Sequence, residues 1–224
     1  MSARIPHSVY STGFGVAYVG LVTNLLTAVA SLPLLVLLVA TDPMWSWPAI
    51  AVAAVLAAPA PVAAFCAFRE NGLGGAGPFR SFVAGYWRTW RKALVIGAMA
   101  VGGMVVLLVD VRALATSTVG VVVVPLLLVL VGLVLATALV ALVALAEAPD
   151  TRLRDILRVS VVLAVRRWYL TLVSLAIIAV QIAVFVNLPA IGVGVTAAAA
   201  LYLAWANSRY TLRPVLLAAE PLAR

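Results

Sequence analysis

Long runs of apolar residues, separated by short segments that hold the charges, dominate this chain. The run at 118–145, TVGVVVVPLLLVLVGLVLATALVALVAL, contains no ionisable residue. A bilayer needs about 20 apolar residues for one helical span, and a soluble core helix needs no such length. The pattern predicts an all-α integral membrane protein with six transmembrane helices, and the whole chain, 1–224, is predicted to be a single membrane domain. The approximate bounds of the predicted spans are 14–40, 48–68, 93–109, 119–146, 169–186 and 190–207.

The distribution of basic residues predicts the orientation of these spans. With six spans, every Lys and Arg except Arg112 falls near the termini or in the two longer loops, 69–92 and 147–168. Loops rich in Lys and Arg stay on the cytoplasmic side of a membrane. Both termini and both long loops are therefore predicted to be cytoplasmic, and the loops on the outer side are short.

Each long loop contains an amphipathic stretch. In 78–92, PFRSFVAGYWRTWRK, aromatic residues recur at helical spacing while the basic residues point elsewhere, and 149–169 has a similar stripe of Leu, Ile and Val. We predict two interfacial helices on the cytoplasmic surface. Anchoring of span ends is one interpretation of these residues, and a binding site for a partner is the other. The candidates for this partner or headgroup interface are Arg80, Tyr86, Trp87, Arg88, Trp90, Arg91, Lys92, Arg154 and Arg158.

Some uncharged polar residues lie within the spans. Asn24, Thr27 and Ser31 recur at spacings of three and four and so share one face of the first span, and Gln181 lies in the fifth. Hydrogen bonding between helices is one interpretation; a polar pocket or a docking stripe is the other. The Ala- and Gly-rich second and sixth spans are predicted to lie inside the bundle, and the Val- and Leu-rich fourth span is predicted to face lipid.

Composition narrows the class of function. The chain is 66% hydrophobic and 10% charged, with a net charge of +8 carried next to the spans, so we expect contact with anionic headgroups and no nucleic acid. No catalytic set or metal cluster can be assembled from the one histidine, His7, and the seven acids. Gly72, Gly74 and Gly77 fit a dinucleotide-binding pattern, but a span precedes them where that motif needs a strand. We therefore predict a loop there and no cofactor.

Three segments of the first half resemble the YesL-like family of small bacterial membrane proteins. They are NLLTAVASLPLL at 24–35, APAPVAAFCAFRE at 58–70 and GPFRSFVAGYWRTWRKAL at 77–94, and the similar region covers about 14–103. The resemblance implies a multi-pass protein of a bacterial plasma membrane that accompanies carbohydrate ABC permeases. It implies no catalytic residue.

Two function hypotheses follow. The first is a non-catalytic accessory membrane protein associated with a bacterial carbohydrate ABC uptake system, whose permease subunits are the candidate partners. The second is a substrate-capturing six-span component of a solute importer. An enzyme is not expected, because no acid–base set or intramembrane charge is present to carry chemistry.

Overall fold

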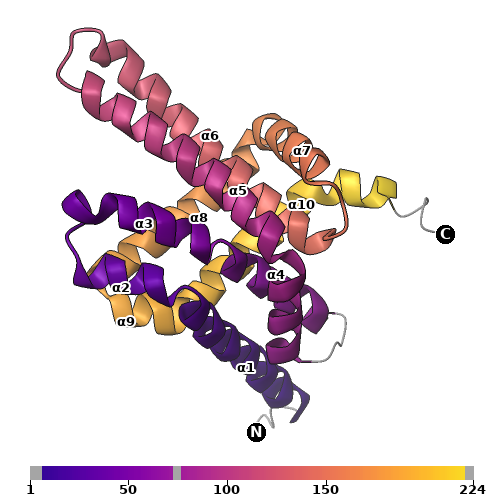
Figure 1. Ribbon diagram of the computed structural model, residues 1–224. Helices are drawn as coiled ribbons and strands as arrows, with labels where there is room; N and C mark the ends of the chain where they lie inside the picture. The colour runs from indigo at the N-terminus through magenta and orange to yellow at the C-terminus, as the bar shows by residue number, and fades with distance from the viewer. Residues whose placement is uncertain (1–6, 73–76, 220–224) are drawn as a thin grey trace, which may run out of the picture.

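The computed structural model describes residues 7–72 and 77–219, and these segments are helices joined by short turns, with no strand among them. Figure 1 shows α5 and α6 as a long hairpin that extends away from the other helices. The motif residue Gly74 lies outside the described residues. The elements are α1 (His7–Ala30), α2 (Leu32–Ala40), α3 (Pro43–Ala57), α4 (Pro59–Gly72), α5 (Pro78–Leu114), α6 (Gly120–Glu147), α7 (Leu153–Arg166), α8 (Trp168–Asn187), α9 (Pro189–Ile191), the π-helix η1 (Gly192–Thr196) and α10 (Ala197–Ala219).

The helices are long and apolar enough for a multi-pass membrane protein. Within the described residues, five stretches meet this requirement, and a sixth is added if the bent pair α1–α2 is one span. Four predicted spans lie, to within one residue, inside the stretches Pro43–Gly72, Pro78–Leu114, Gly120–Glu147 and Trp168–Asn187. The last stretch, Pro189–Arg213, contains the sixth.

The predicted first span, 14–40, is not one straight helix. α1 and α2 meet at Ser31 with a bend of 73°. Pro33 lies in the first turn of α2. Proline has no backbone N–H to donate, so a helix tolerates it in the first turn far better than in the interior. This position breaks the run into two helices, and the two count as one span only as a bent pair.

The most buried element is α4. Its residues from Ala60 to Ala67 are almost all inaccessible, and it packs against α1, α5, α6 and α10. Small side chains allow this close approach, so the prediction that the second span lies inside is confirmed. The prediction that the fourth span faces lipid is wrong for its second half. Val121 and Val122 are exposed, whereas Val143 and Leu145 are fully buried in the core.

The third predicted span is part of a longer helix. The sequence suggests a separate helix over 79–92 and a span that begins at 93, but α5 is continuous from Pro78 to Leu114. At 1.5 Å per residue it is about 55 Å long, well beyond the roughly 30 Å of a bilayer core. Position 93 is therefore no helix boundary. The second amphipathic stretch does form a separate helix, α7, which ends before α8 begins.

Small residues set the contacts of α5 with α4 and with the end of α3. The buried face of α5 carries Ser81, Gly85, Thr89, Ala93 and Gly97, spaced by four residues. A Cβ added at Gly85 would lie 2.6 Å from Cys66 Cβ, and one added at Gly97 would lie 2.6 Å from Ala58 Cβ. Only glycine fits at this separation. The face that packs inside is therefore this small-residue row together with Phe82 of the aromatic stripe, which is 4% exposed.

Candidate functional site

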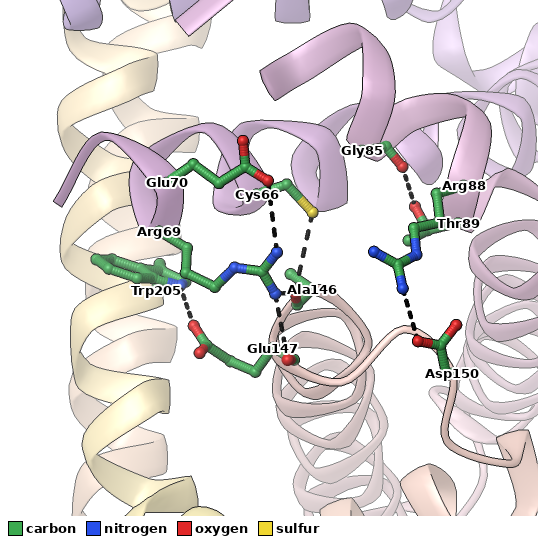
Figure 2. A network of polar contacts seen from close by, with 10 residues as sticks. All are labelled: Cys66, Arg69, Glu70, Gly85, Arg88, Thr89, Ala146, Glu147, Asp150 and Trp205. Atoms are coloured by element: carbon green, nitrogen blue, oxygen red, sulfur yellow. Dashed lines mark hydrogen bonds and ion pairs between the residues drawn. The ribbon is translucent and has the colours of Figure 1, made fainter. Parts of the chain in front are cut away.

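The C-terminal end of α6 is the centre of a polar network (Figure 2). The last carbonyls of a helix lack partners within it and carry the negative end of its dipole. Arg69 of α4 donates to the carbonyls of Ala146 and Glu147, the second at 3.2 Å. Lys92 of α5 donates through Nζ to the carbonyls of Pro149 (2.6 Å) and Thr151 (2.9 Å) just beyond the helix. Arg69 thus caps α6, and Lys92 binds the turn that follows it.

The Glu147 side chain connects α10 to the C-terminal end of α6. It is only 6% exposed; one carboxylate oxygen accepts a hydrogen bond from Trp205 Nε1 at 3.0 Å. The other oxygen lies 3.6 Å from Arg209 Nε, whose guanidinium stands over the Trp205 ring. A largely buried carboxylate needs such partners, since an unpaired charge there is costly. The sequence does not indicate this cluster, because its members are far apart in the chain and lie singly at span ends.

Two of the predicted interface residues, Arg88 and Lys92, already bind other groups of the chain. Besides Lys92, Arg88 of α5 forms an ion pair with Asp150, at 2.6 Å. Both side chains of the pair are largely exposed, so it contributes at most about 1 kcal/mol. Arg88 and Lys92 therefore serve first to hold the α6–α7 turn against α5.

Other predicted interface residues form an exposed surface. Arg80, Trp87 and Arg91 are exposed and follow one another at spacings of seven and four, which places them on one face of α5. This face, named here the α5 basic face, lies opposite the packed row that contains Gly85. Trp87 is 68% exposed. Trp90 is half-buried, and the Arg91 guanidinium lies 5.2 Å from its ring centroid.

Tyr86 lies beside this face, half-buried, with its ring edge toward Trp87. The remaining two predicted interface residues, Arg154 and Arg158, are exposed on α7. Neither forms an ion pair with any residue that the structure describes. The structure therefore divides the predicted interface into an internal group, the α5 basic face, and two free cations on α7.

The predicted intramembrane polar stripe is divided as well. Asn24 Nδ2 donates to the carbonyls of Gly194 (2.9 Å) and Val195 (3.1 Å), and its Oδ1 accepts from the N–H of Ala198. Its side chain thereby satisfies backbone groups around the π-turn η1, where the regular α-helical ladder is interrupted. This supports hydrogen bonding between helices as the role of Asn24.

Gln181 serves the same turn from α8. Its Nε2 donates to the carbonyl of Gly192 at 2.7 Å, and its Oε1 accepts from Thr196 at 2.9 Å. Thr27 Oγ1 is buried without a partner among the described residues, and Ser31 makes no side-chain cap at the start of α2. Only Asn24 and Gln181 of the four stripe residues thus converge, and what they bind is the chain itself.

Among the residues that the structure describes, no three His, Cys, Asp or Glu side chains are placed to hold a metal ion. The chain was also compared with known proteins. No family model, no curated protein and no solved structure matches it.

Proposed function

We propose that this multi-pass protein is a non-catalytic accessory component that associates with another membrane protein through the α5 basic face. The observation that carries the proposal is the exposed row Arg80, Trp87 and Arg91, which nothing else in the described chain covers. Trp and Arg are enriched among residues that dominate binding energies at protein interfaces.

The rigidity of α5 supports this assignment. Arg80 and Arg91 are 11 residues apart, or about 16 Å along the helix axis. The opposite face of the same turns packs tightly on α4, with Gly85 against Cys66. A row held on a continuous, closely packed helix is pre-organised, which lowers the entropy lost when a partner binds.

The proposed partner is a permease subunit of a carbohydrate ABC uptake system in a bacterial plasma membrane, with both termini of this chain in the cytoplasm. Support for this partner is the resemblance of 14–103 to the YesL-like family. The alternative, a substrate-capturing importer component, would use polar side chains such as Asn24 and Gln181 to bind solute. Both are occupied by backbone groups of the chain itself, so no observation favours that function.

Affinity purification in mild detergent tests the proposal. The chain and a double variant, Arg80→Ala with Arg91→Ala, are purified from membranes, and the co-purifying subunits are identified. The matched control is Arg166→Ala with Arg213→Ala, which removes the same two charges from exposed positions outside α5. We expect permease subunits to co-purify with the chain and the control, and the double variant to lose them at unchanged abundance.

If both variants recover equal amounts of permease subunits, the α5 basic face is not the docking site. If no permease subunit co-purifies even with the unaltered chain, the proposed partner is wrong. Uptake of the corresponding sugar by cells that carry each variant gives an independent reading. It should fall with the double variant and stay unchanged with the control.

A further inference from the structure

An apolar groove runs between α5, α6 and α7. Its volume is about 280 Å³. Ile96, Met99 and Ala100 of α5 form one wall, and Leu157 and Val161 of α7 form another. α6 provides the remaining lining residues, Leu133, Val134, Thr137 and Ala138. The groove is smaller than the roughly 300–1,000 Å³ of typical small-molecule pockets, which suits a slender hydrocarbon chain.

One end of the groove is basic. Arg154 precedes Leu157 by three residues, and Arg158 precedes Val161 by three, so both cations flank the α7 wall. Lys92 lies one turn before Ile96, and its contact with the Thr151 carbonyl holds the start of α7 at the same end. The N-terminus of α7 has no side-chain cap, and Asp155 in its first turn offsets part of the positive dipole end.

The acids near this end do not cancel the charge. Asp150 is paired with Arg88 at 2.6 Å. Asp155 precedes Leu157 by two residues, a spacing that directs it away from the groove. The free cations Arg154 and Arg158 thus stand beside an apolar groove, which is the complement of a molecule with an anionic head and an apolar tail.

We propose that this groove is a binding site for one anionic phospholipid, with an acyl chain along α5 and α6 and the phosphate held by Arg154 and Arg158. The site does not depend on the α5 basic face or on any partner. Its ligand is part of the membrane around it, so occupancy follows from lipid composition. A bound lipid would also join α7 to the hairpin formed by α5 and α6.

Native mass spectrometry of the full chain in mild detergent tests the site. Dioleoylphosphatidylglycerol and dioleoylphosphatidylcholine, which share acyl chains and differ in net charge, are titrated separately. We expect one phosphatidylglycerol per chain, bound at least about fivefold more tightly than phosphatidylcholine, which corresponds to one Arg near an anionic group. Arg154→Ala with Arg158→Ala should abolish this preference. Arg166→Ala, which removes a charge from the opposite face of α7, should leave it intact.

Filling the groove tests the position of the acyl chain. Ala100→Phe places a ring between the walls and should weaken binding of both lipids, whereas Ala98→Phe, at an exposed position of the same helix, should not. Met99→Trp fills the groove from a residue that is 56% exposed, and it replaces Ala100→Phe if that variant does not fold. Folding is checked through the buried thiol of Cys66, which a folded chain protects.

Three outcomes would overturn the proposal. The first is equal affinity for the two lipids in the unaltered chain. The second is phosphatidylglycerol binding that survives both groove-filling variants, because the apolar groove would then hold no acyl chain. The third is a lipid-independent dimer that Met99→Trp dissociates, because the occupant of the groove would then be a second copy of the chain.

Discussion

Gly97→Ala should weaken the contact between α5 and the end of α3, although alanine is the better helix former. The new Cβ would stand 2.6 Å from Ala58 Cβ, and 3.5 Å from the carbonyl oxygen of Val55. Carbon atoms in favourable contact are about 3.5–4.0 Å apart. The two helices must therefore move apart by about 1 Å, and neither methyl group has a torsion that relieves the clash.

The magnitude follows from two opposing terms. Overpacking of this kind costs about 1–3 kcal/mol. Replacing glycine by alanine within a helix raises the free energy of unfolding by up to about 1 kcal/mol. Gly102→Ala, in the same helix, isolates the second term, because a Cβ there meets nothing within 4 Å. We expect the free energy of unfolding of Gly97→Ala to lie about 1–3 kcal/mol below that of Gly102→Ala.

The single cysteine provides the assay. Cys66 is 4% exposed in α4, so a thiol-reactive dye should label it only when the protein unfolds. For a chain of this length, 2 kcal/mol corresponds to a difference of about 4–8 °C in the midpoint of a thermal scan in detergent. Ala58→Gly should restore the Gly97→Ala midpoint by removing the opposing methyl group. Equal midpoints for Gly97→Ala and Gly102→Ala would refute this account of the close contact.

Three further outcomes are expected. Asn24→Ala removes the amide that binds the backbone around η1 and should cost about 1–2 kcal/mol in the same dye assay; Ser31→Ala should cost almost nothing, and equal losses would contradict the assignment. Arg69→Met should lower stability by about 1–3 kcal/mol, because it leaves carbonyls at the end of α6 without a donor; an unchanged midpoint would show that Arg69 does not cap α6. The last outcome concerns topology and is measured in a chain whose Cys66 is replaced by Ser. If the termini are cytoplasmic, a cysteine at Asn187 should react with an impermeant thiol reagent on intact cells, and one at Thr151 should not. The reverse labelling pattern would show that the predicted orientation is wrong.

The centres of the helices were predictable, because the runs of apolar residues correspond to them. The fourth and fifth predicted spans differ from α6 and α8 by about one residue at each end. Burial of the second span followed from its alanines. Hydropathy responds to average composition over about 20 residues, so it detects such features well. It does not give the sharpness of the bend between α1 and α2, which is 73° and depends on the backbone at Ser31.

Contacts between distant segments were not predictable from one sequence. The stripe formed by Asn24, Thr27 and Ser31 is a local pattern, but the partner of Asn24 is a turn about 170 residues away. A π-turn has no simple composition signature, so nothing near Gly194 indicated that it would need a donor. Gly85 and Gly97 likewise resemble other glycines of apolar helices until the opposing Cys66 and Ala58 are in place.

The basic residues also divide into two groups that the sequence alone does not separate, and the division affects how a binding experiment is interpreted. All of those in the long loops contribute equally to the predicted orientation, but the structure uses them differently. Arg69 caps the end of α6 and Lys92 binds the turn beyond it, so replacing them should destabilise the protein before it affects any partner. Arg80, Arg91 and Arg154 are exposed, so replacing them should alter binding at nearly constant stability. A loss of binding identifies a docking surface only when it occurs in this second group, and measuring stability on every variant separates the two.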